Sequence, residues 1–131
     1  MLQVRQGIEN TVIVELGKNE IDILIKSCNF VNNEIIGGFH ARLGADREEL
    51  EALILLMQSA LKNFNHQPRL IQISVEQLRI LVQVLNKVCH GIYISDFKSK
   101  IGSNRNSLKS FLRLTENSYR AIENSREDNY N

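Results

Sequence analysis

Twice along the chain, a short segment dense in apolar residues is followed by a longer segment whose apolar residues have helical spacing. Two segments rich in Val, Ile and Leu, residues 11–16 (TVIVEL) and 69–74 (RLIQIS), predict short β-strands. Each is followed by apolar residues at the three- and four-residue intervals of a helix face. These residues are Ile21, Leu24, Ile25, Cys28 and Val31 after the first strand, and Leu78, Leu81, Val82, Leu85 and Val88 after the second. We therefore predict two strand–helix units whose helices face a common core.

The recurrence extends over most of the chain. Residues from 14 onwards align with residues from 71 onwards at an offset of 57, which becomes 58 after one inserted residue near Ile94. The aligned pairs include Ile23 with Ile80, Asn29 with Asn86, Phe39 with Phe97, Gly44 with Gly102, Arg47 with Arg105 and Leu50 with Leu108. Each half is predicted to form a strand, a helix, an extended elbow and a second helix.

This pattern predicts a single α+β domain that is mostly α. An internally duplicated strand-helix-elbow-helix unit would span residues of about 11–62 and 69–122 and pack about a pseudo-twofold axis. At most a small two- or three-stranded sheet is expected. The segment 123–131 has few apolar residues, so we expect a frayed tail there.

Residues typical of helix N-termini stand at corresponding places in both halves. The pairs that mark these starts are Gly17 with Glu20, Asp46 with Glu49, Ser74 with Gln77, and Asn104 with Ser107. Shortly before each second helix stands a glycine, Gly44 or Gly102. We expect these two glycines to turn the chain with φ > 0, a conformation that most side chains disfavour.

Composition limits the functions open to the chain. Its 131 residues, 43% hydrophobic and 24% charged, fit one domain with one core. The formal net charge of +1 provides no overall field to attract nucleic acid or an anionic membrane. The first residues do not resemble a signal peptide, and the longest apolar run is the six residues 52–57. We expect a cytoplasmic protein that does not insert into membranes.

The two halves differ most in the charge of their second helices. Residues 96–120 carry six Lys and Arg side chains against two carboxylates, a local balance of +4. The first candidate surface, the basic face, comprises Lys98, Lys100, Arg105, Lys109 and Arg113. The second, the acidic face, comprises Asp46, Glu48, Glu49 and Glu51. The basic face suits an acidic protein or phosphate, although charged helix faces are often only solvated.

Residues 96–112 (DFKSKIGSNRNSLKSFL) resemble the helix-turn-helix motif of DNA-binding proteins. The residues that match its buried positions and its turn glycine are Phe97, Ile101, Gly102, Leu108 and Phe111. The resemblance implies a regulator whose second helix reads DNA. The segment departs from the motif at Lys98, where a small residue is usual, and at Ser103, where an apolar one is usual. The first half has the same frame before an acidic helix, which phosphate would repel, so the frame also has a purely structural explanation.

No arrangement typical of an enzyme or a metal site appears in the sequence. The candidate metal ligands are His40, His66, His90, Cys28 and Cys89, and no two have the spacing that brings ligands together on one surface. Both cysteines lie in apolar helical patterns and are interpreted as reduced core residues, which we favour over a Cys89 nucleophile. Glycine-rich phosphate loops and nucleophile elbows are missing. We therefore expect no catalytic site, cofactor or metal.

The function expected from these features is binding rather than catalysis. We expect a small interaction protein that occupies the surface of another protein, as a bacterial inhibitor, antitoxin or immunity-like protein does. Phe30, Ile36 and Phe39 form a candidate apolar contact patch, unless Phe30 only covers the edge of the core. The alternative is a DNA-binding regulator using segment 96–112. The sequence does not decide whether the chain forms a homodimer.

Overall fold

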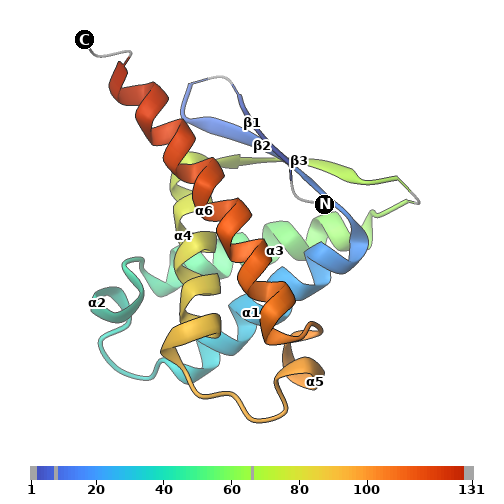
Figure 1. Ribbon diagram of the computed structural model, residues 1–131, viewed down its shortest axis with the longest axis vertical. Coiled ribbons are helices and arrows are strands. Elements are labelled where there is room, and N and C mark those ends of the chain that lie inside the picture. Colours follow the sequence, from blue (N-terminus) through green and yellow to red (C-terminus); the bar gives the residue numbers. More distant parts are fainter. Residues whose placement is uncertain (1–2, 8, 66, 129–131) are drawn as a thin grey trace.

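A small antiparallel sheet lies at one end of a group of helices (Figure 1). The computed structural model describes residues 3–7, 9–65 and 67–128. In this range the sheet has the order β1 (Gln3–Gln6), β2 (Thr11–Leu16) and β3 (Arg69–Ser74). Val14 of β2 lies opposite Ile71 of β3, and both are buried. The strands predicted for residues 11–16 and 69–74 are thus confirmed.

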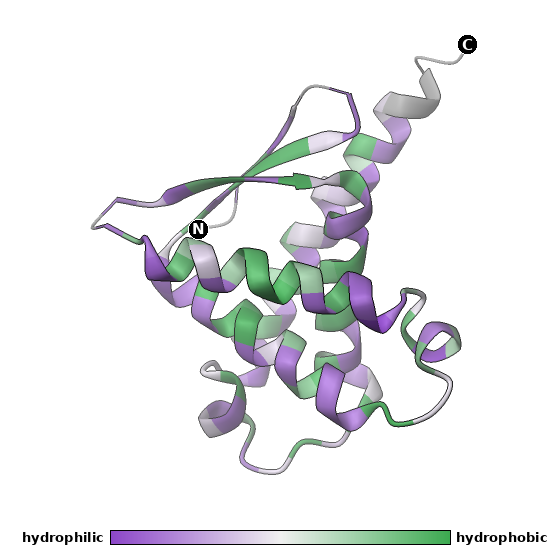
Figure 2. Cartoon of the chain, turned by 180° about the vertical axis from the view of Figure 1, so that it is seen from behind, coloured by the Kyte–Doolittle hydropathy of each residue, from purple (hydrophilic) through white to green (hydrophobic). Residues whose placement is uncertain are grey.

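In each half two longer helices follow the strand as predicted, but the elbow between them, which was expected to be extended, contains a short helix. In the first half they are α1 (Lys18–Glu34), α2 (Phe39–Leu43) and α3 (Arg47–Lys62). In the second half they are α4 (Val75–Asn86), the one-turn π-helix η1 (Lys87–Gly91), α5 (Phe97–Ile101) and α6 (Arg105–Asp128). Apolar and polar residues lie on different sides of the long helices (Figure 2). The fold is α+β and mostly helical, as predicted.

One core joins the two halves. α1 packs against α3, α4 packs against α6, and α1 and α4 contact each other. The predicted core faces are buried: Leu24 and Cys28 of α1, and Leu78 and Leu85 of α4, are at most 1% exposed. Burying such side chains stabilises the fold by roughly 1.5–3 kcal/mol each.

The residues predicted to start the helices make the hydrogen bonds expected of helix caps. At the start of α4, the Ser74 hydroxyl accepts a hydrogen bond from the Gln77 N–H, and the Gln77 side chain accepts one from the Ser74 N–H, both 2.9 Å long. At the start of α6, Oδ1 of Asn104 accepts from the Ser107 N–H at 2.8 Å. These bonds satisfy backbone donors that a helix N-terminus leaves without partners.

The two elbows have the same backbone geometry. Each opens with a left-handed residue, Gly38 (φ 61°) or Asp96 (φ 57°), and each closes with a left-handed glycine, Gly44 (φ 80°) or Gly102 (φ 90°). The positive φ predicted for Gly44 and Gly102 is therefore confirmed. These glycines end α2 and α5 in the left-handed conformation that commonly caps a helix.

Each elbow helix lies against the first helix of the other half. α2 contacts α4, and α5 contacts α1. A Cβ atom at Gly44 would lie 3.3 Å from Nη1 of Arg79 on α4, and one at Gly102 would lie 3.6 Å from Ile23 on α1. A duplicated unit would produce such reciprocal contacts. The duplication itself and its pseudo-twofold axis stay predictions.

In the first half, an arginine holds the elbow against the end of α1. Arg47 at the start of α3 donates hydrogen bonds of 2.6 Å to the backbone oxygens of Asn32 and Ile35 and to Oδ1 of Asn32. Its guanidinium carbon lies 4.3 Å from the centre of the Phe39 ring. Backbone oxygens at a helix C-terminus have no partner within the helix, and a positive charge there is favourable.

In the second half, Arg105 occupies the same place. It donates a hydrogen bond of 2.6 Å to the backbone oxygen of Cys89 in η1, and its guanidinium carbon lies 4.6 Å from the centre of the Phe97 ring. The two arginines therefore anchor their elbows in the same way, although Arg47 makes more hydrogen bonds than Arg105.

Two segments differ from the pattern described above. The sequence analysis did not identify β1, which pairs with β2 through Val4 opposite Val14. Its residues QVRQ contain a single apolar side chain, so no alternating pattern marks them. α6 continues to Asp128, so residues 123–128 of the segment expected to be frayed are helical. Residues 129–131 lie outside the described range.

The arginine anchors lead to a prediction about stability. Arg47→Ala should lower the free energy of unfolding by about 2–3 kcal/mol, because it leaves backbone oxygens at the end of α1 without a donor. Arg105→Ala, which removes one such bond and a ring contact, should cost about 1 kcal/mol. Urea denaturation of both variants measures the difference. Arg47→Lys should recover little of the loss, since lysine lacks the planar fork of donors. An equal cost for both alanine variants would contradict this account.

Candidate interaction surface

The five residues of the basic face do not form one surface. Lys98 and Lys100 lie two residues apart on α5, so their side chains leave the helix about 200° apart. Lys109 and Arg113 lie four residues apart on α6 and share one side of it. Lys98 and Arg113 are exposed, and Lys109 is half-buried. The structure thus brings Lys109 and Arg113 together and separates Lys98 from Lys100.

Two members of the basic face are engaged within the chain. Arg105 is half-buried and bound to Cys89 and Phe97, as described above. Nζ of Lys100 donates a hydrogen bond of 3.2 Å to the hydroxyl of Ser95. The sequence alone did not show that Arg105 is used inside the chain. A cation at the start of an amphipathic helix can point toward solvent or back over the end of the preceding helix.

The acidic face is divided in a similar way. Oδ1 of Asp46 lies 2.8 Å from Nδ1 of His40, and the Asp46 N–H donates to a Glu49 carboxylate oxygen at 3.0 Å. These two carboxylates organise the start of α3. Glu48 and Glu51 are exposed and make no hydrogen bond or ion pair with any residue in the described ranges. Only these two remain available to a partner.

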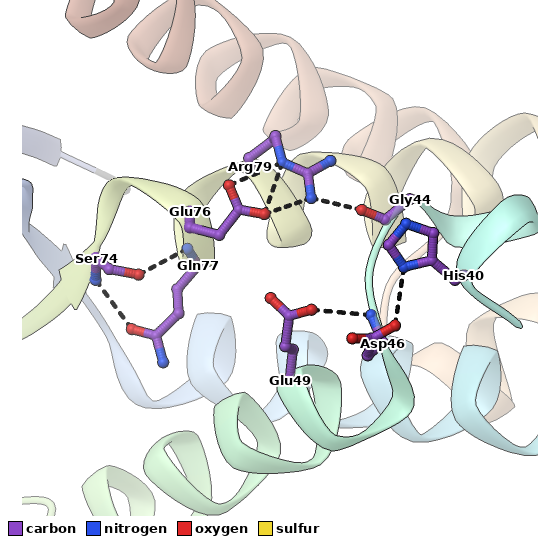
Figure 3. A network of polar contacts seen from close by, with 8 residues as sticks. All are labelled: His40, Gly44, Asp46, Glu49, Ser74, Glu76, Gln77 and Arg79. Atoms are coloured by element: carbon purple, nitrogen blue, oxygen red, sulfur yellow. Dashed lines mark hydrogen bonds and ion pairs between the residues drawn. The ribbon is translucent and has the colours of Figure 1, made fainter.

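Beside the acidic face, Arg79 of α4 joins the two halves (Figure 3). Its Nη2 donates a hydrogen bond of 2.5 Å to the backbone oxygen of Gly44, and its Nε donates one of 3.0 Å to Glu76. The bond from Arg79 lowers the pKa of Glu76, although burial partly opposes it, and the bond from Glu76 raises the pKa of Arg79. Because these polar groups satisfy one another, the network has a role in the fold.

The two cysteine thiols are poorly suited to nucleophilic chemistry. Cys28 is fully buried, and its burial raises its pKa to about 12. Burial also raises the pKa of Cys89, with Arg105 and Lys109 acting in the opposite direction. A thiol with a raised pKa is protonated at neutral pH, and the thiolate is the reactive form. The interpretation of both residues as buried free thiols agrees with the structure.

The histidines are not gathered into a metal site in the part of the chain that the structure describes. His40 bonds to Asp46, and His90 lies in η1. No group of three or more His, Cys, Asp or Glu side chains there has the arrangement a metal ion needs. His66 lies outside the described residues.

The candidate apolar patch is only partly exposed, and another exposed residue was missed. Phe30 and Phe39 pack against the core, whereas Ile36 is 90% exposed. Tyr93 was not singled out by the sequence analysis, yet it is also 90% exposed, in the loop that leads to α5. The loops that hold Ile36 and Tyr93 both lie away from the sheet (Figure 1). An isolated aromatic residue in a loop has no periodic signal in the sequence.

Comparisons with known proteins give no relative. No protein family matches the chain, and no curated protein or solved structure is similar to it. Among the described residues, no helix is both long and apolar enough to cross a bilayer.

The Arg79 network leads to a prediction about pH. Because the pKa of Glu76 is lowered in the folded chain, its ionised form stabilises the fold above its ordinary pKa of 4.5, and this contribution is lost as the pH falls through the folded pKa. Glu76→Gln should lower the free energy of unfolding at pH 7 by a small amount, since solvent screens this 53% exposed side chain. The difference between variant and parent should shrink below about pH 4.

Denaturant titrations at pH 7 and at low pH measure the effect. Glu51→Gln is the control, because Glu51 has no hydrogen-bond or ion-pair partner within the described ranges. A Glu76→Gln variant as stable as the parent at pH 7 would show that the pair contributes nothing.

Proposed function

We propose that this chain is a non-enzymatic protein that binds another protein through the free cations of α5 and α6. The observation that carries the proposal is that the side chains of Lys98, Lys109 and Arg113 make no hydrogen bond or ion pair with any described residue. Other surface cations of these helices are engaged, Arg120 with Glu116 at 3.6 Å and Lys100 with Ser95. Unpaired cations favour association with an acidic surface and increase its rate.

Tyr93 supports this location for the contact. Residues that dominate binding energy at protein interfaces are often Tyr, Trp and Arg. Tyr93 is nearly fully exposed, and Ser95 in the same loop is hydrogen-bonded to Lys100 of α5, so the loop lies next to the basic residues. An exposed aromatic ring in the loop that leads to α5 can add an apolar anchor to the charge complementarity of the free cations.

The buried state of the thiols favours binding over catalysis. Cys28 and Cys89, the strongest nucleophiles in the sequence, both have raised pKa values. A protein of this kind acts by occupying a surface, as a cytoplasmic inhibitor, antitoxin or immunity-like protein of a bacterium does. This comparison is one of size and type of action, not of ancestry.

The proposal is tested with a face variant and a matched control. Lys98→Glu/Lys109→Glu/Arg113→Glu reverses the free cations, and Arg5→Glu/Lys18→Glu/Lys62→Glu makes the same change in net charge at exposed cations elsewhere. Parent and control, immobilised and exposed to extract of the source cells, should enrich the same acidic protein. The face variant should bind it at least about tenfold more weakly, since several charge contacts are reversed. Circular dichroism verifies that each variant is folded.

Two results would contradict the proposal. Equal enrichment by the face variant would place the contact elsewhere. Equal loss of binding in the face variant and the control would show that binding depends only on net charge and is therefore non-specific.

The resemblance of segment 96–112 to a DNA-binding motif is tested separately. The structure engages Arg105 internally and gives α5 only five residues. We therefore expect the parent protein to bind a labelled random DNA duplex weakly, and no more tightly than the control variant does. Fluorescence anisotropy at two salt concentrations measures this, because phosphate contacts weaken steeply as salt rises. Tight, salt-sensitive binding that only the face variant loses would instead favour the DNA-binding regulator.

A further inference from the structure

A separate hollow of about 240 Å³ lies between α2 and the end of α4. Its lining consists of Arg42 from α2, Gln83 and Asn86 from α4, and Lys87, His90 and Gly91 from η1. Three of these side chains can carry positive charge, two are amides that can donate hydrogen bonds, and none is a carboxylate. The hollow is smaller than the 300–1,000 Å³ typical of sites for drug-sized ligands, so it suits a small ligand.

The cationic side chains around this hollow are not neutralised by the chain. The side chains of Arg42, Lys87 and His90 form no hydrogen bond or ion pair with any residue in the described part of the chain. Three such groups held near one another repel each other when charged, which costs stability. An anion bound between them would remove that cost and gain charge-assisted hydrogen bonds.

The corresponding place, where α5 of the second half lies on α1 of the first half, provides an internal comparison. Lys100 aligns with Arg42, and Lys26 with Gln83. Both lysines are engaged, Lys26 with Asp22 at 3.0 Å and Lys100 with Ser95 at 3.2 Å. The positions of Lys87 and His90 are taken there by Phe30 and Asn33. The two places thus share the frame, but of the two only the one between α2, α4 and η1 gathers cationic side chains without partners among the described residues.

The π-helix η1 positions Lys87 for this purpose. A Cβ atom at Gly91 would lie 3.0 Å from Cδ of Lys87, so the glycine leaves room for the lysine side chain to lie across the turn. Single π-turns within α-helices are frequent at functional sites. Because α1 is α-helical throughout, this π-turn occurs at the end of α4 but not at the corresponding end of α1.

We propose that this hollow binds the phosphate group of a small soluble ligand. The planar guanidinium of Arg42 offers two parallel donors to two phosphate oxygens, Lys87 and His90 add charge, and the amides of Gln83 and Asn86 donate to the remaining oxygen sites. A doubly charged tetrahedral anion uses these convergent donors more fully than a planar carboxylate does. The site does not rest on the protein partner proposed above, because it shares no residue with Lys98, Lys109 and Arg113.

Nuclear magnetic resonance can test the site with inorganic phosphate as the probe. The side-chain amide signals of Gln83 and Asn86 and the backbone signals of η1 are followed in a phosphate titration at constant ionic strength. Saturable shifts with a dissociation constant on the order of 1 mM are expected. Arg42→Gln and Lys87→Gln should each weaken binding at least about tenfold, because each removes a charge-assisted contact. Lys100→Gln, the matched change at the aligned position of α5, should leave binding unchanged.

Several outcomes would overturn the proposal. Shifts that grow linearly without saturation, or equal weakening by Lys100→Gln, would show a general ionic effect. Acetate that binds as tightly as phosphate would assign the hollow to carboxylates. If phosphate and glycerol phosphate fail to bind while vesicles containing phosphatidic acid sediment the parent but not Arg42→Gln, the ligand is a lipid headgroup. The thermal midpoint of each variant verifies folding, since these side chains lie on the surface and their loss should not unfold the chain.

Discussion

The hydrogen bonds from an arginine to the end of the preceding helix determine how this chain turns through each elbow. α2 and α5 have five residues each and are too short to be stable alone. Arg47 and Arg105 fix them by binding the preceding helix end and the elbow phenylalanine at once. Phe39 and Arg42 lie three residues apart on α2, so they share one side of this short helix. The anchor at Phe39 therefore helps to fix the helix that carries Arg42 to the hollow.

The common frame explains how two halves of similar design present different surfaces. The glycines, phenylalanines and arginines of the elbows are fixed by backbone geometry and by contacts within the chain, so their identity is constrained in both halves. The positions around them face solvent and are free to differ. In the first half the surface cation Lys26 is neutralised by Asp22, and the carboxylates Asp46 and Glu49 organise a helix start. In the second half the surface positions of η1 and α6 carry cations whose side chains have no partner among the described residues, such as Lys87 and Arg113.

The sequence predicted those features that arise from neighbouring residues. The Val-, Ile- and Leu-rich strands, the apolar helix faces, the capping pairs and the left-handed Gly44 and Gly102 are local features, and all were identified correctly. β1 was missed because its pairing with β2, not its composition, makes it a strand. η1 was missed because tertiary packing, and not a local pattern of residue types, determines where a π-turn forms. The inward use of Arg105 and the grouping of Arg42 with Lys87 depend on packing between distant segments, which a linear pattern does not contain.

η1 links the two candidate surfaces. Its backbone is used on one side, where the oxygen of Cys89 accepts the bond from Arg105 and so fixes the start of α6. Its side chains are used on the other, where Lys87 and His90 line the hollow beside α2. A regular α-helical turn would orient these side chains differently relative to the Cys89 oxygen. The wider turn therefore has a structural reason to be retained, because it satisfies the elbow anchor and the cation cluster in the same five residues.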